Sequence, residues 1–204
     1  MKIKNPIIKY TTQQDINTSL EFQNAIYEEN IKGTKQISNT EFNSCIFKNI
    51  DFTNIELKNI DLIDVIFENC NLSNKDFNYK IIHRVIFNKC KLTGMNLIEA
   101  SIKDVQLINC NCNYMNLTEA RITNLTISNS DLKESTLNET KIKNIELIKN
   151  NLNNMEIMNT NLSNIDFSTC NIENIRIDKN SLKGIIIAPY QAPYLIHMLG
   201  VKIK

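Results

Sequence analysis

A large apolar residue recurs at every fifth position between about residues 37 and 187. The series keeps its register throughout, and it changes in kind only at Cys112, where a cysteine replaces the large residue. Its members include Phe42, Phe47, Phe52, Leu57, Leu62 and Phe67 near the start and Ile172, Ile177, Leu182 and Ile187 near the end. A run of this length with one strict period predicts a single repetitive architecture.

A period of five suits neither an α-helix nor a flat strand. In a helix, five residues advance the side-chain direction by about 140° per repeat, so the apolar residues would spread around the axis. In a flat strand, an odd period would place successive apolar residues on opposite faces. The chain is therefore expected to turn a corner within every repeat.

A second, smaller apolar residue lies two positions before most of the large ones. Cys45 precedes Phe47 in this way, and Val65 precedes Phe67. A spacing of two places both side chains on one side of a short extended segment. The remaining positions hold mostly Asn, Asp, Ser, Thr, Lys and Glu, which suit turns. Four such corners would close a square coil, with neighbouring coils stacked about 4.8 Å apart.

The repeats Cys70-Asn71-Leu72-Ser73-Asn74 and Thr160-Asn161-Leu162-Ser163-Asn164 resemble those of the pentapeptide-repeat family. The resemblance extends over about four fifths of the chain. It implies an all-β fold, a right-handed quadrilateral β-helix whose interior holds both apolar positions. On this basis residues 20–187 form the β-helix, residues 1–19 an N-terminal arm or cap, and residues 188–204 a C-terminal capping helix and tail.

Two prolines interrupt the repeat after residue 187, and the apolar residues that follow are spaced for one face of a short helix. This segment also resembles the C-terminal cap of the Qnr-like members of the family, whose caps commonly pair. The resemblance therefore implies a homodimer, with contacts at Tyr190, Tyr194, Leu195 and Met198.

The 204-residue chain is nearly neutral, with 23 basic and 22 acidic residues. The basic residues form no stripe of the kind that follows phosphates, so direct binding of nucleic acid is not expected. No apolar run approaches the roughly 18 residues of a membrane span, and the first residues lack the apolar core of a signal peptide. A cytoplasmic location without membrane attachment is expected.

Six cysteines invite a disulfide or metal interpretation, but none forms a Cys-x-x-Cys pair and only two histidines accompany them. Cys70, Cys90 and Cys110 are twenty residues apart, and Cys170 falls in the same series at the small interior position. This spacing indicates cysteine used as a small apolar residue. In a reducing compartment these side chains stay thiols, and no metal or cofactor is expected.

Three surface features are candidates for function. Ile46, Ile66 and Ile86 recur at the outward position between the two interior residues. They form a β-branched ladder suited to an exposed strand, a surface covered by residues 1–19, or an apolar patch that binds a partner.

The second candidate is an irregular coil. A long cation occupies the small interior position at Lys75 and again five residues later. Because an unpaired cation cannot stay in an apolar interior, the coil is expected to open between Lys75 and Arg84.

The third candidate is acidic. Glu99, Glu119 and Glu139 share one corner position and should stack about 4.8 Å apart. They form either a solvated face or an acidic stripe that contacts a basic partner.

No glycine-rich phosphate loop, metal constellation or nucleophile paired with a base is present, so an enzyme is not expected. The family resemblance implies a protein-interaction rod. In the Qnr-like members this rod binds DNA gyrase or topoisomerase IV as a mimic of duplex DNA and protects against quinolones. The near-neutral charge weighs against that function, because duplex mimics are strongly acidic. The alternative is a scaffold or immunity-type protein whose protein partner is not a topoisomerase.

Overall fold

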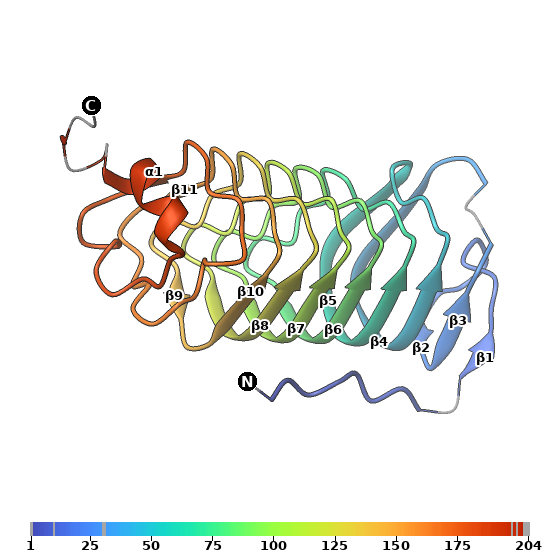
Figure 1. Cartoon of the computed structure of the whole chain (residues 1–204). Helices are drawn as coiled ribbons and strands as arrows, with labels where there is room; N and C mark the ends of the chain where they lie inside the picture. Colours follow the sequence, from blue (N-terminus) through green and yellow to red (C-terminus); the bar gives the residue numbers. More distant parts are fainter. Residues whose placement is uncertain (1, 10, 30–31, 197, 199, 202–204) are drawn as a thin grey trace.

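The chain winds as a four-sided parallel β-solenoid, each coil stacked on the one before it (Figure 1). The computed structural model describes residues 2–9, 11–29, 32–196, 198 and 200–201. His197 and the last three residues of the expected tail lie outside these ranges. Successive coils are offset by twenty residues, so that Phe47 pairs with Phe67, and Phe67 with Phe87.

One parallel sheet contains most of the strands, and its order follows the chain. Its main path comprises β1 (Thr12–Gln13), β3 (Ala25–Tyr27), β4 (Lys35–Lys48), β5 (Ile55–Glu68), β6 (Ile81–Asn88), β7 (Ser101–Ile108), β8 (Arg121–Ser128) and β10 (Ile145–Ile148). The short strands β2 (Phe22–Gln23) and β9 (Lys141–Ile142) pair with β4 and β8. A separate two-stranded sheet contains β11 (Glu156–Ile157) and β12 (Arg176–Ile177).

The chain ends in a 3-10 turn, η1 (Pro189–Gln191), followed by the helix α1 (Ala192–Ile196). The predicted β-solenoid with a short C-terminal helix is therefore confirmed.

Stacked large side chains fill the interior. The rings of Phe47, Phe67 and Phe87 are parallel, with neighbouring centroids 5.0 Å apart, and none is more than 2% exposed. Leu107 extends the same column. The ring separation matches the spacing of hydrogen-bonded strands, about 4.8 Å, so ring stacking and the backbone ladder favour the same register. The predicted interior column is confirmed.

The small interior position carries a second repeated interaction. The thiols of Cys70, Cys90 and Cys110 each donate to the backbone carbonyl 23 residues earlier, over 3.3 to 3.4 Å. The hydroxyl of Thr140 makes the equivalent bond in a later coil. All six cysteines are buried free thiols, and burial raises the pKa of Cys45 to about 11. Cysteine therefore serves here as a small core residue, as predicted.

Most corners adopt a left-handed backbone conformation. Among the residues that the structure describes, twenty-five other than glycine have φ between 49° and 64°, and thirteen of them are asparagine. Apart from glycine, asparagine is among the residues that tolerate this conformation best. Some corner amides also bond along the stack, as Asn69 Nδ2 does to Asn49 Oδ1 at 2.8 Å. The corners therefore explain much of the chain's asparagine content.

Polar side chains help to close both ends of the solenoid. At the N-terminal end Ile16 is 1% exposed, and Lys35 Nζ donates to three backbone carbonyls of residues 16–19. At the other end Gln191 is fully buried, and its amide donates to two carbonyls of the last coil. Leu195 of α1 is buried beside it in the core.

The coil does not open near Lys75, so that prediction is wrong. The backbone there keeps the pattern of the other coils, with the N–H of Lys80 donating to the carbonyl of Phe77. The ammonium of Lys75 donates to the carbonyl of Ile55 at 2.7 Å, and that of Lys80 to the side chain of Asn59. Both long side chains leave the interior at a corner, so neither charge is trapped in the core.

We expect Phe87→Asp to lower the free energy of unfolding by roughly 4 kcal/mol, because it removes a buried ring and leaves a carboxylate without a partner. The measurement is urea unfolding followed by circular dichroism. The adjacent Asn88→Asp, on the outer surface, is the matched control and should change stability by less than about 0.5 kcal/mol. Equal midpoints for the two variants would refute the interior assignment.

Candidate functional site

Residues 2–9 run as an extended arm along the outside of the solenoid, beneath the sheet in Figure 1. The arm is held by its own backbone N–H groups, which donate to side chains in one corner column of successive coils. These bonds are Lys4 to Asp104 (3.4 Å), Ile7 to Asp64 (2.8 Å) and Lys9 to Ser44 (2.7 Å). The arm therefore runs opposite to the direction in which the coils progress.

The column under the arm is charged and buried. Asp64 is 6% exposed and Asp104 only 1%. Arg84 lies between them in the stack and places Nη2 2.5 Å from Asp64 Oδ2. Asn124 Nδ2 donates to Asp104 Oδ1 at 2.8 Å. Asp104 Oδ2 has no hydrogen-bond partner in the described structure and lies 3.9 Å from His83 Nε2.

Local interactions set the charge states in this column. Burial alone would raise the pKa of Asp64, but hydrogen bonds from Arg84 and from the N–H of Ile7 outweigh burial and lower it. The pKa of His83 is lowered by burial and by the neighbouring cations Arg84 and Lys103. At neutral pH the column therefore holds the ionised carboxylate of Asp64 and the guanidinium of Arg84, with the neutral imidazole of His83 in the neighbouring column, and Asp64 accepts a hydrogen bond from the arm.

Ile46, Ile66 and Ile86 stack in one half-buried column beside the arm. Gln106 continues this column, and its amide donates to Asn5 of the arm at 2.9 Å. Of the three interpretations of the stripe, this placement favours a surface partly covered by the N-terminal residues. A role as partner contact stays a prediction.

Glu99, Glu119 and Glu139 lie in one exposed corner column, and Tyr79, 66% exposed, precedes them in it. All four residues have left-handed backbones, with φ between 54° and 63°. Asparagine adopts this conformation at lower cost, so the corner geometry alone does not explain their presence. None of the three carboxylates forms an ion pair within the described ranges.

The side of the solenoid next to this column is acidic over three central coils. Its residues 94–100, 114–120 and 134–140 include no Lys, Arg or His. Tyr114, 57% exposed, and Glu134 occupy the opposite corner of the same side, again with left-handed backbones. We call this surface the acidic side; its prominent residues are Tyr79, Glu99, Tyr114, Glu119, Glu134 and Glu139.

Sequence reasoning missed two tyrosines and one glutamate of the acidic side. Like residues spaced by twenty reveal a column of glutamates, but Tyr79, Tyr114 and Glu134 have no such repetition. Their residue type identifies them: each stands at a corner with a left-handed backbone, where asparagine is the commonest residue.

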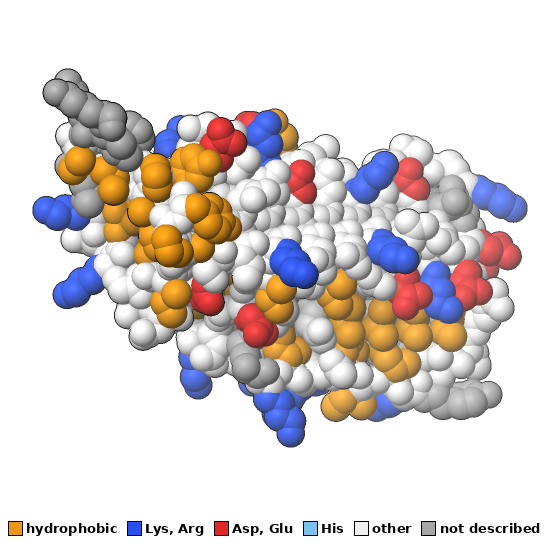
Figure 2. Space-filling model, in the orientation of Figure 1, with side chains coloured by type: hydrophobic (Ala, Val, Ile, Leu, Met, Phe, Trp, Pro, Cys, Tyr) orange, Lys and Arg blue, Asp and Glu red, His pale blue; other side chains and the backbone are white. Residues whose placement is uncertain are grey.

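The C-terminal end carries an exposed apolar patch (Figure 2). Tyr190 is 66% exposed, Ile186 46% and Tyr194 41%. Leu195, expected as a surface contact, instead packs in the core with 8% exposure, because α1 turns this side chain inward. Met198 is half-buried against the same core. The surface available for pairing therefore centres on the two tyrosines.

The described part of the chain contains no group of three or more His, Cys, Asp and Glu side chains that could hold a metal ion. Among its helices, none has the length and apolar character needed to cross a membrane.

Two family models match the sequence. The model described as "Pentapeptide repeat region" matches residues 60–137 and 80–154, and "Pentapeptide repeats (8 copies)" matches residues 36–74. Together the matches run from residue 36 to residue 154, more than half of the 204 residues. No curated protein matches the chain.

Solved structures match at low identity. Trypsin-treated QnrB1, a plasmid-mediated fluoroquinolone resistance protein, is 18% identical, with 94% of this chain and 95% of that chain covered and a TM-score of 0.47. HetL, involved in heterocyst differentiation regulation in the cyanobacterium Nostoc sp. strain PCC 7120, is 15% identical, with 88% and 92% covered and a TM-score of 0.47. With TM-scores below 0.5, these likenesses carry no functional argument.

We expect the stability of the protein to fall on acidification from about pH 7 to about pH 5, in part through His83. Its folded pKa lies below 6.5, so the unfolded chain binds more protons in this interval, and stability is lost as the pH falls through the folded pKa. Urea unfolding at several pH values should show a shallower pH dependence for His83→Gln than for the parent. Parallel dependences would mean that His83 titrates alike in both states.

Proposed function

Because the chain belongs to the pentapeptide-repeat family, we propose that it acts as a cytoplasmic, non-enzymatic rod that binds a protein partner through the acidic side. The observation that carries this proposal is the concentration of four carboxylates and the exposed Tyr114 on three segments without a basic residue, 94–100, 114–120 and 134–140, with Tyr79 exposed on the preceding coil. Six free thiols support a reducing compartment.

The acidic side has the physical properties of a binding surface. The backbone ladder makes it rigid, so little conformational entropy is lost when a partner binds. Exposed tyrosines supply large contact areas and are enriched at interfaces. The carboxylates of Glu99, Glu119 and Glu139, which form no ion pair within the described residues, attract a basic surface and raise the rate of encounter, whereas Glu134 is paired with Lys133. The partner that fits is therefore a protein with a basic groove or ridge.

A finer form of the proposal is that the partner is a bacterial type II topoisomerase, DNA gyrase or topoisomerase IV, with protection against quinolones. A straight rod with one acidic side supports it, since such a rod could occupy a duplex-binding groove. Charge density limits the affinity. Duplex DNA carries one charge per about 1.7 Å of axis, whereas one corner column here offers one carboxylate per about 4.8 Å. We expect micromolar or weaker binding.

The second candidate is a scaffold or immunity-type protein with a different protein partner. Mixed charge over the rest of the surface favours it, since basic and acidic side chains are interspersed over the face in Figure 2. The net charge of +1 agrees with this picture.

The test is supercoiling by gyrase of the native host, with and without a fluoroquinolone, as the protein is titrated to micromolar concentration. If a topoisomerase is the partner, Glu99→Gln, Glu119→Gln and Glu139→Gln combined should weaken the effect about tenfold, because each exposed pair contributes up to about 1 kcal/mol. The control replaces three exposed acids elsewhere, Glu21, Glu29 and Glu173, by Gln.

An equal loss in both variants would assign the effect to net charge instead of to the acidic side. If the parent protein neither inhibits supercoiling nor relieves the drug, the topoisomerase partner is excluded and the second candidate remains.

We also propose a homodimer through the C-terminal patch. A two-fold pairing of rod ends closes the assembly and prevents open-ended stacking. We expect Tyr190→Ser with Tyr194→Ser to shift the protein from dimer to monomer in sedimentation at tens of micromolar, while Tyr79→Ser with Tyr114→Ser leaves the dimer intact. A parent protein that sediments as a monomer would end this proposal.

A further inference from the structure

The N-terminal arm lies in a groove that bonds to its main chain. The acceptors in this groove are Ser44, Asp64 and Asp104, which occupy equivalent corner positions and are at most 6% exposed. Each accepts a backbone N–H of the arm, and the Ser44 hydroxyl also donates to the carbonyl of Ile7 at 3.3 Å. Arg84 fixes the carboxylate of Asp64 from the adjacent coil. We call these acceptors, together with the neighbouring column Ile46, Ile66 and Ile86, the arm groove.

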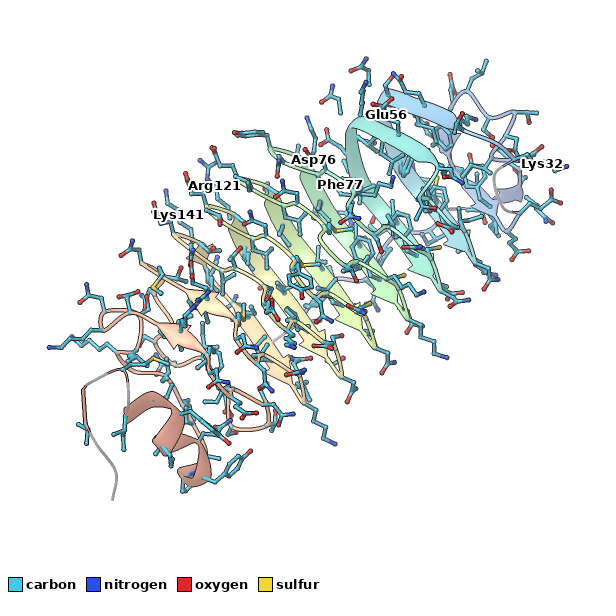
Figure 3. The ribbon with its side chains drawn as sticks, turned by 90° about the horizontal axis from the view of Figure 1, so that it is seen from above. Lys32, Glu56, Asp76, Phe77, Arg121 and Lys141 are labelled. Atoms are coloured by element: carbon cyan, nitrogen blue, oxygen red, sulfur yellow. The ribbon has the colours of Figure 1, made fainter. Side chains whose placement is uncertain are left out.

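The spacing of the acceptors matches an extended chain. The coils stack as parallel layers along the rod (Figure 3), so equivalent positions two coils apart are separated by roughly 10 Å. Ile7 and Lys4, which bond to acceptors two coils apart, are three residues apart, and three extended residues span about 10 Å. The coil between those acceptors presents Arg84, whose side chain has no acceptor. One of the two arm residues between Ile7 and Lys4 is Pro6, which has no N–H to satisfy. The arm therefore fits the groove as a ligand fits a receptor.

Burial along the arm shows which of its side chains the solenoid covers. Ile3, Pro6 and Ile8 are half-buried, whereas the other side chains of residues 2–9 are exposed. Ile7, next to Ile8, is 60% exposed. The isoleucine column of the groove is half-buried with the arm in place, so departure of the arm would expose more of it. An exposed apolar surface of this kind favours a replacement occupant.

Few interactions hold the arm. Within the described ranges, residues 2–9 are attached by three backbone N–H bonds, the bond from the Ser44 hydroxyl and a side-chain bond between Asn5 and Gln106. None of the three lysines of the arm forms an ion pair with a described residue. The net contribution of one hydrogen bond is comparable to the free energy lost in ordering the backbone of one residue. The docked arm is therefore only marginally stable, and such segments open at low cost.

The link between the arm and the first coil is too short for arms to be exchanged between copies stacked end to end. Gln13 of β1 pairs with Ile26, and Ile26 with Ile46, so β1 lies two coils before the coil in which Ser44 binds Lys9. The step from Lys9 to β1 spans at most about 10 Å, which two coils already require. The groove of a stacked copy would begin beyond that copy's own first two coils. Another chain is therefore the occupant that can replace the arm.

We propose that the arm groove binds an extended basic segment of a partner protein, and that the arm is its exchangeable cover. The segment shares the chemistry of residues 2–9, which combine lysines and no acidic residue with apolar side chains on either side of a proline. An acidic segment would place carboxylates next to those of Asp64 and Asp104, and one oxygen of Asp104 already has no hydrogen-bond partner in the described structure. The groove borders the main sheet and shares no residue with the acidic side.

The experiment uses the full chain and a fluorescent peptide with the sequence of residues 2–9, followed by fluorescence anisotropy. Because the arm of the same chain competes, we expect weak binding to the parent. Binding to Ile8→Asp should be at least fivefold tighter, since this change weakens the cover and leaves the groove intact. The control Ile7→Asp makes the same change at the exposed neighbouring residue and should alter affinity less than twofold. A peptide with its three lysines replaced by Glu should bind at least tenfold more weakly.

Two modified peptides test whether the groove recognises main chain. N-methylation of the peptide at Ile7 removes the donor that Asp64 accepts, and it should weaken binding to the Ile8→Asp protein at least tenfold. N-methylation at Ile8, whose N–H has no acceptor in the described structure, is the matched control and should weaken binding less than threefold.

Methyl NMR locates the bound peptide. The peptide should shift the methyl signals of Ile46, Ile66 and Ile86 and leave that of Ile186, at the C-terminal end, unchanged. No binding to Ile8→Asp at millimolar peptide, equal affinities of the two variants or of the two N-methylated peptides, or unshifted groove methyls would each overturn the proposal. So would shifts of these methyls that grow with protein concentration in the absence of peptide, because they would identify a second copy as the occupant.

Discussion

Every other feature depends on the stacking of each residue on the one twenty positions later. The parallel ladder holds successive coils at the interstrand spacing, and the interior stacks of Phe47, Phe67 and Phe87 repeat that spacing at 5.0 Å. Two interactions with one common period reinforce each other, since a shift of register would disrupt both. The thiol bonds to carbonyls 23 residues earlier add a third interaction with the same period.

The same constraint shapes the outer surface. Side chains at the equivalent position of successive coils stack in a column. A few substitutions at one such position therefore give a column of one chemical type, such as the carboxylates of Glu99, Glu119 and Glu139. Core packing constrains the residue type least at the corners. The main requirement there is the left-handed backbone conformation, which asparagine adopts at low cost. A tyrosine or glutamate in that conformation is consistent with selection for contact, since local preference is most often overridden at functional sites.

Two parts of the solenoid depart from the regular backbone hydrogen bonding between coils, and they do so in different ways. Along one corner, the arm supplies backbone N–H donors to Asp64 and Ser44, so buried polar groups outside the ladder are satisfied by the chain itself. Between residues 141–148 and residues 161–168 the ladder is interrupted, and within the described ranges the N–H of Ile145 has no backbone acceptor. The first place carries the charge of Arg84, and the second carries both the cations Arg121 and Lys141 and the carboxylate of Glu146. Both departures therefore combine backbone hydrogen bonding with charge.

The five-residue period alone determined the interior columns, the corners and the change of structure near Pro189, because these depend on local side-chain alternation and on stacking of like positions. Only the tertiary structure decided the path of the arm, whose residues carry no periodic signal. It also showed that Lys75 bonds outside the core, since a flexible four-carbon chain can carry the ammonium past the corner. Leu162 and Phe167 keep the period, although no backbone hydrogen bond in the described ranges joins their segment, residues 161–168, to residues 141–148. The five-residue period predicts that both residues are buried. Only the backbone pairing in the tertiary structure shows which neighbouring coil they are bonded to.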